Sequence, residues 1–257
     1  MALAWSDHTI SLTSLLQANS WSNATSYRAI DLRHSAIDMS RQEGQELLDV
    51  LRAPKLHRHG EPKKVYVEWG AGGSTELVAY LALSGLVEGG LRAYSIESSL
   101  GWMQVMRMRS GLVAAAEKAG HLKFIHGNIG PTVHLGYPAP GWNKSDIART
   151  MRYVGLGQLG ERAFDVVLDD GRFRVACALE ALSYLRPSSV VLLHDFAVRK
   201  RGASPQRVAW YTQMLVDKGF FTVVRKNETL GVLAPGLEAE NASAIAVTLR
   251  QALEFPE

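Results

Sequence analysis

The sequence contains a single cysteine, Cys177, and it has neither a long apolar run nor a strong excess of one charge. One cysteine cannot form an intrachain disulfide, and the apolar stretch around it predicts a small core residue rather than a nucleophile. No segment approaches the roughly 18–20 apolar residues that a membrane-spanning helix needs. The first residues lack the basic and apolar regions of a signal peptide. We therefore expect no membrane span and a cytoplasmic or organellar protein.

The charge balance is mild, because the net charge is only +3 over 257 residues. It allows an anionic partner, but it does not indicate a nucleic-acid-binding surface. Hydrophobic residues make up 47% of the chain, which is enough for one large domain with an extension. Glycosylation sequons keep a secretory lumen open as an alternative location. The asparagines of these sequons are Asn23, Asn143, Asn227 and Asn241.

The most informative segment, residues 65–77, joins an apolar run to a glycine-rich turn. The run at 65–69 predicts a buried strand, and Ser74 or Thr75 is suited to cap the helix that follows. Glycines in such a turn let backbone N–H groups approach a ligand closely. The three glycines of the turn are Gly70, Gly72 and Gly73.

A second predicted strand, at 91–97, ends in Glu97. A carboxylate at this spacing is placed to accept hydrogen bonds from ribose hydroxyls. The two segments together predict the first half of a nucleotide-binding unit, and the alternative is an ordinary strand-to-helix turn. Glu68, two residues before the first glycine, departs from the dinucleotide fingerprint G-x-G-x-x-G. It would add negative charge beside a pyrophosphate, whereas it suits a cofactor with a cationic amino group.

The pattern E-x-G-x-G-x-S resembles the first motif of the class I S-adenosylmethionine-dependent methyltransferases. The matching residues are Glu68, Gly70, Gly72 and Ser74. The resemblance covers about residues 63–234, and it implies that S-adenosylmethionine is the cofactor. It also implies that further residues contact this cofactor, one of which follows the third predicted strand. These further residues are Gly73, Glu97 and Asn128.

Strand and helix signals alternate through the rest of the chain and predict an α/β fold. We expect a Rossmann-like, doubly wound, seven-stranded sheet, mostly parallel, with one antiparallel strand from a C-terminal hairpin. The remaining strands are expected at 122–127, 164–168, 189–193, 220–225 and 229–234, and helices at 41–51, 100–119 and 147–154 among others. Ser40 and Glu43 predict a capping box for the first of these helices, and the methionines of the second (Met103, Met106 and Met108) are expected to be core residues. Residues 1–62 form an N-terminal arm, a leading helix and a basic linker. Residues 63–257 form the methyltransferase-like domain, with an insert at 128–163.

Acids and a histidine follow the fourth and fifth predicted strands: Asp169, Asp170, His194 and Asp195. Three interpretations stay open. The layout resembles metal-dependent O-methyltransferases, in which case Asp169 and Asp195 would hold Mg²⁺. His194 could instead act as general base, oriented by Asp170 or Asp195. In the third interpretation Asp195 is a cap and His194 is a hydrogen-bonded loop residue.

The function that we expect is methyl transfer to an oxygen of a small-molecule or glycan-like acceptor. An anionic acceptor would suit Arg172 and Arg174, together with the basic run at 199–201. In the alternative, these two arginines pair with Asp169 or Asp170, and the basic run is a solvated face. The alternative is a catalytically silent subunit that docks on a protein partner through residues 1–39 or 128–163. A nicotinamide-dependent oxidoreductase is disfavoured by Glu68.

Overall fold

The structure is a computed structural model that describes residues 40–53, 63–133, 136–142, 147–197, 204–227 and 229–253. The expectations for the arm at 1–39 and the basic run at 199–201 lie outside these residues. No helix in the described ranges is both long and apolar enough for a membrane crossing.

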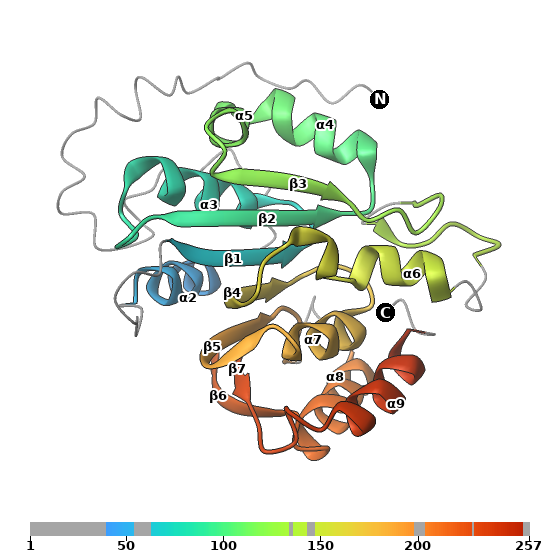
Figure 1. Ribbon diagram of the computed structural model, residues 1–257. Helices are drawn as coiled ribbons and strands as arrows, with labels where there is room; N and C mark the ends of the chain where they lie inside the picture. Colours follow the sequence, from blue (N-terminus) through green and yellow to red (C-terminus); the bar gives the residue numbers. More distant parts are fainter. Residues whose placement is uncertain are drawn as a thin grey trace.

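A seven-stranded sheet forms the centre of the molecule (Figure 1), in the order β3-β2-β1-β4-β5-β7-β6. The strands are β1 (Lys64–Trp69), β2 (Leu91–Glu97), β3 (Leu122–His126), β4 (Phe164–Asp169), β5 (Leu185–Leu193), β6 (Phe221–Asn227) and β7 (Leu230–Pro235). The first five pair in parallel, and β7 lies antiparallel between β5 and β6. The predicted Rossmann-like sheet, with one antiparallel strand from a hairpin, is confirmed.

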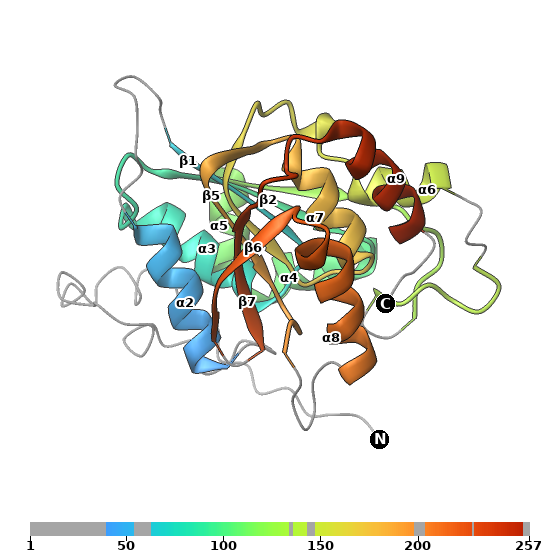
Figure 2. The ribbon, with the colours of Figure 1, turned by 90° about the horizontal axis from the view of Figure 1, so that it is seen from below.

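Helices cover both faces of the sheet, as the view from below shows (Figure 2). One face carries α2 (Arg41–Arg52), α3 (Gly73–Ser84), α4 (Leu100–Arg109) and α5 (Gly111–Lys118). The other carries α6 (Ile147–Val154), α7 (Arg174–Leu182), α8 (Pro205–Tyr211), the π-helical segment η5 (Thr212–Asp217) and α9 (Ala242–Ala252). Side chains alternate along each strand, so that Tyr66 packs in the first layer and Val67 in the second.

The leading helix α2 packs on the core of the domain. Its capping box forms as predicted, with the Glu43 amide donating to Ser40 Oγ and the Ser40 amide donating to Glu43 Oε2. The apolar side chains of this helix, Leu47, Leu48 and Leu51, are buried against the sheet. The ammonium of Lys64 on β1 donates to carbonyls at the end of the helix, those of Val50, Leu51 and Ala53.

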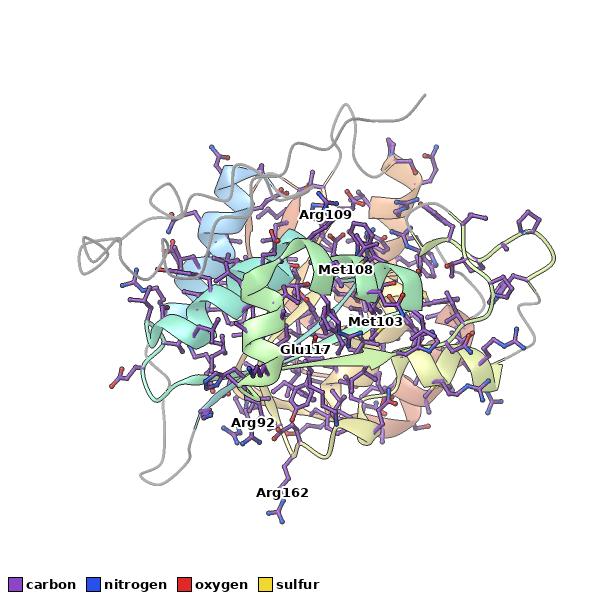
Figure 3. The ribbon with its side chains drawn as sticks, turned by 90° about the horizontal axis from the view of Figure 1, so that it is seen from above. Arg92, Met103, Met108, Arg109, Glu117 and Arg162 are labelled. Carbon is purple, nitrogen blue, oxygen red and sulfur yellow. The ribbon has the colours of Figure 1, made fainter. Side chains whose placement is uncertain are left out.

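The helix expected at 100–119 is two helices, because Ser110 interrupts it. The Ser110 amide donates to the Met106 carbonyl and closes α4, while its hydroxyl accepts from the Val113 amide and opens α5. Met103 and Met106 face the core, whereas Met108 is 75% exposed (Figure 3). The interpretation of these methionines as core residues therefore holds for two of the three.

The carboxyl ends of β1, β2 and β3 point to the side where α6 and the insert lie (Figure 1). Part of the insert forms a small hairpin, in which Thr132 bridges Pro138 and the Val133 amide donates to the Tyr137 carbonyl at 2.8 Å. The predicted helix at 147–154 is present as α6. Ligands of open α/β sheets bind at this end of the strands, so a ligand site is expected here.

We expect Leu51→Ala to lower the free energy of unfolding by about 2–5 kcal/mol, because it opens a cavity between α2 and the sheet. The matched control is Leu237→Ala, the same change at a side chain that is 99% exposed. Its effect should stay within about 0.5 kcal/mol. Urea unfolding measures both, and equal small effects would mean that α2 does not pack on the domain.

Candidate functional site

The glycine turn after β1 lies tightly against the turn after β4. Gly70 has a φ of +87°, and a Cβ there would lie 2.8 Å from the Asp170 carbonyl oxygen. Only glycine meets both conditions without strain. Gly72 differs, since its backbone is extended and a Cβ would meet nothing within 4 Å. Gly73 is buried in the first turn of α3.

Glu68 is fully buried beneath this turn. It accepts hydrogen bonds from the Tyr66 hydroxyl at 2.7 Å, from Ser74 Oγ at 2.8 Å and from Thr75 Oγ1. Burial raises the pKa of Glu68, and the hydroxyl donors offset part of that rise. From the sequence, this carboxylate was expected to contact the cofactor. In the structure it accepts hydrogen bonds from three hydroxyl groups of the protein. Its direct contact with a cofactor stays a prediction.

Glu97 joins the end of β2 to the glycine turn. Its Oε2 accepts from the Ala71 amide at 3.1 Å, and its Oε1 accepts from the Ser99 amide at 2.8 Å. The indole of Trp102 donates to the Ala71 carbonyl at 2.7 Å and holds the turn from the other side. Burial raises the pKa of Glu97, against the opposing effect of the amide donors. A contact between Glu97 and a bound ribose stays a prediction.

Asn128 follows β3, as predicted, and its side chain is exposed. Its Oδ1 accepts from the Gly130 amide at 2.8 Å, which is an Asx-turn. The turn uses the carbonyl side of the amide only. A contact between Asn128 and an adenine ring stays a prediction.

On the other half of the sheet, a buried arginine bridges two of the predicted acids. Arg174 Nη2 lies 3.0 Å from Asp170 Oδ1, and Arg174 Nη1 lies 3.0 Å from Asp195 Oδ2. The Nη1 group also donates to the Tyr211 hydroxyl at 3.2 Å, where α8 passes into its π-helical end. Both carboxylates are therefore held by one guanidinium, whose own side chain is 2% exposed.

His194 extends this chain of charges toward α2. Its Nδ1 donates to Asp170 Oδ1 at 2.8 Å, and its Nε2 lies 3.8 Å from Glu43 Oε2. Burial lowers the pKa of His194, but the charge and hydrogen bond of Asp170 and the contact with Glu43 outweigh it and raise the pKa to about 10. The ring is protonated at neutral pH, so in this state it donates a proton rather than accepts one.

Glu43 is a member of the site that the sequence did not reveal. The capping box was its only local signal, yet the side chain is fully buried and also accepts from the Thr229 amide at 3.0 Å. Burial raises its pKa, but contacts with His194, Thr229 and the Ser40 amide lower it to about 2. Glu43 therefore carries a full negative charge beside His194.

The magnesium site expected at Asp169 and Asp195 does not fit this arrangement. The Asp169 side chain is fully buried, and Asp195 is paired with Arg174. Over the described ranges, no group of three or more His, Cys, Asp or Glu side chains is arranged to hold a metal. The positive charge between these strands comes from Arg174 and His194.

The fold of this chain is similar to that of a solved structure. A methyltransferase-like protein from Silicibacter pomeroyi DSS-3 aligns with a TM-score of 0.59 and 22% identity, over 84% of this chain and 97% of that chain. The likeness shows that this chain shares the fold of that methyltransferase-like protein. Precorrin-6y C5,15-methyltransferase from Geobacter metallireducens GS-15 aligns at 13% identity over 77% of this chain and 88% of that chain, with a TM-score of 0.42, too low to add to the assignment. No protein-family model and no curated protein matches the sequence.

The turns that follow β4 and β5 contain backbone strain. Among the described residues other than glycine, only Phe173 and Asp195 have a positive φ, of 58° and 59°. Such conformations cost about 1–3 kcal/mol each and persist where the surroundings hold them, often at functional sites. Phe173 is fully buried against Trp142 of the insert and Tyr153 of α6.

We expect Gly70→Ala to destabilise the protein by about 1–3 kcal/mol, because the alanine is strained at this φ and its Cβ meets the backbone of the turn after β4. Gly72→Ala is the matched control, since the space around Gly72 is open. Thermal unfolding of both variants checks the difference. Equal stability would show that the two turns are not in contact.

The pKa of His194 predicts how stability depends on pH. Because folding raises this pKa from 6.5 to about 10, the stabilisation is complete below pH 6.5 and is lost as the pH rises toward 10. Urea unfolding at a series of pH values should show this decline in wild type and a smaller one in His194→Gln. Asp170→Asn removes the charge that raises the pKa of His194, so stability should decline over a narrower range of pH. An unchanged slope in both variants contradicts the assignment.

Proposed function

We propose that this protein binds S-adenosylmethionine and transfers its methyl group to an oxygen of a small-molecule or glycan-like acceptor. The observation that carries the proposal is the hydrogen bond from the Ala71 amide to Glu97. It fixes the glycine turn and the acid after β2 as one unit at the carboxyl ends of adjacent strands. This is where open α/β sheets bind nucleoside ligands.

The residues at this end fit the cofactor, which supplies an activated methyl group. Glu97 would accept hydrogen bonds from the ribose hydroxyls, and the Gly70–Gly73 backbone would lie against the ligand. Asn128, exposed next to them, would contact the adenine ring. Ser74 and Glu68 support the turn from beneath, so their contribution is to its shape.

The acceptor would lie over β4 and β5. His194 and Arg174 keep the pKa of Asp170 low against the opposing effect of burial, so that this carboxylate stays ionised. Asp170 and Asp195, whose side chains are 28% and 19% exposed, would then accept hydrogen bonds from the acceptor hydroxyl and orient its oxygen. As the oxygen takes the methyl group, the hydroxyl proton would pass to one of these two carboxylates. Rate enhancement would come chiefly from this deprotonation and from holding the oxygen in line with the methyl group.

A second candidate is a catalytically silent subunit of a larger assembly. The observation that favours it is the closed chain of ion pairs, in which Asp170, Asp195 and His194 all have partners within the protein. The described part of the insert, or the arm at 1–39, would then dock on a protein partner. Cofactor binding separates the two candidates.

The compartment is proposed to be the cytoplasm or an organelle, with the secretory lumen as the alternative. Of the four sequon asparagines, only Asn241 has a described side chain. It is exposed, and it caps α9 by accepting from the Ala244 amide at 3.0 Å. Its Nδ2, which a glycan would modify, donates to Glu238 at 2.9 Å.

We expect wild type to bind S-adenosylmethionine. Glu97→Gln should bind it at least about tenfold more weakly, because it loses a hydrogen bond to a charged group. Isothermal titration calorimetry measures both. Glu88→Gln is the matched control, because Glu88 is exposed and lies at the opposite end of β2.

Absence of binding at about 1 mM ligand, in a sample shown to be folded, would sink the enzyme proposal. Copurification in a stable complex with no cofactor bound would then favour the silent subunit. Equal weakening by Glu97→Gln and Glu88→Gln would mean that cofactor binding does not involve Glu97.

A further inference from the structure

Glu43 lies in the first turn of α2, and hydrogen bonds fix both oxygens of its carboxylate. The Ser40 amide donates to Oε2 at 2.8 Å, and the Thr229 amide donates to Oε1 at 3.0 Å. The Thr229 hydroxyl donates to Oε1 as well. The side chain is fully buried, so these donors determine where its negative charge lies.

Thr229 also holds the turn that follows β5. It lies between β6 and β7, and its carbonyl accepts from the Phe196 amide at 2.7 Å. Phe196 comes two residues after His194. One residue of the hairpin thus contacts both Glu43 and the turn of His194, and it brings the start of α2 against that turn.

His194 lies between Glu43 and Asp170. Its Nδ1 donates to Asp170 Oδ1 at 2.8 Å, whereas its Nε2 lies 3.8 Å from Glu43 Oε2. The Nε2 atom is buried and makes no hydrogen bond to the described part of the chain. At 3.8 Å the contact with Glu43 is an ion pair without a hydrogen bond. Glu43 therefore acts on the ring through its charge.

Two other charged groups face the ring of His194. Asp195 Oδ1 lies 4.0 Å from Nδ1, and the guanidinium of Arg174 acts to lower the pKa of the imidazole. Arg174 pairs with Asp170 and with Asp195 at 3.0 Å, so each of these carboxylates is shared between two cations. Within the described residues, Glu43 is the carboxylate beside His194 that Arg174 does not contact.

The charge of Glu43 matters most when the charge of Asp170 changes. Under the proposed function, the acceptor oxygen forms a bond to the methyl carbon as the C–S bond of the cofactor breaks, and its proton passes to a carboxylate. Arg174 and His194 both donate to Asp170 Oδ1, so Oδ2 would take this proton. A protonated Asp170 attracts the imidazolium less strongly. Glu43, whose pKa is lowered to about 2, stays ionised and retains it.

We propose that Glu43 is a positioning residue for Asp170, and that it acts by holding His194 in place as a cation. His194 would keep Oδ1 of Asp170 occupied and leave Oδ2 for the acceptor hydroxyl. The inference rests on the proposed function, of which it specifies what supports the acceptor site. It also gives α2, which lies outside the predicted methyltransferase-like domain, a role at that site.

The test follows the ¹⁵N-labelled His194 ring by NMR spectroscopy over a series of pH values, with the His194→Gln spectrum as the assignment. Glu43→Gln removes the charge and keeps the capping box, because a glutamine oxygen can also accept from the Ser40 amide. We expect the wild-type ring to lose its proton near pH 10. In Glu43→Gln the transition should fall by about 1–3 pH units, because the opposite charge beside Nε2 is gone. The carboxyl ¹³C signal of Asp170 should follow the same transition in both proteins.

The matched control is Glu46→Gln, which removes the same charge from another buried position of α2. Glu46 accepts from Arg225 on β6 at 2.9 Å, so its loss should leave the His194 transition at the wild-type pH. The proposal is overturned if Glu43→Gln leaves the transition unchanged, or if the control lowers it as much. If Glu43→Gln does not fold, Glu43→Asp replaces it. This variant keeps the charge but withdraws it from the ring by one methylene, so a smaller fall is expected and an unchanged transition overturns the proposal.

Calorimetry with S-adenosylmethionine on the wild-type protein separates this inference from the function on which it rests. A lowered transition in Glu43→Gln without cofactor binding would leave the coupling of Glu43 to Asp170 and remove the methyltransferase proposal. Cofactor binding with an unchanged transition would retain the methyltransferase proposal and remove the positioning role of Glu43.

Discussion

The organisation of the turns that follow β4 and β5 depends on the ion pairs of Arg174. Burying a guanidinium is unfavourable unless carboxylates and further hydrogen bonds surround it, and Asp170, Asp195 and Tyr211 provide both. This one side chain ties the end of β4 to the end of β5 and to α8. His194 then completes the pairing of Asp170 and reaches Glu43, so that α2 belongs to the same electrostatic unit.

This unit explains why a metal is not needed to hold the acids together. Two carboxylates at neighbouring strand ends repel one another unless a cation lies between them. Here the guanidinium of Arg174 and the imidazolium of His194 fill that role with charges that the protein carries itself. Both residues with left-handed backbones belong to or adjoin these ion pairs, since Asp195 pairs with Arg174 and Phe173 precedes Arg174.

The fold and the glycine turn were predictable, because their signals are local. Strand periodicity gave the order of elements, and the serine of the capping box at Ser40 lies three residues from its partner. The ion pairs at the ends of β4 and β5 mostly join residues that are far apart in sequence, so no local sequence pattern could predict them. Glu43 shows the limit well, since its capping role was visible and its contact with His194 was not. The break at Ser110 was missed because the hydrophobic pattern continues through it.

The structure changes what is expected of the two acids beside the glycine turn, Glu68 and Glu97. A charged Glu68 beside the turn was expected to select a cationic ligand over a diphosphate. Its burial and raised pKa weaken that electrostatic argument, because a fully enclosed carboxyl that receives three hydroxyl donors acts through geometry. Selection of the ligand would then depend on Glu97, which holds the Ala71 amide and lies at the strand end. Under the proposed function, Glu68 and Ser74 would therefore set the shape of the turn, and Glu97 would contact the bound ligand.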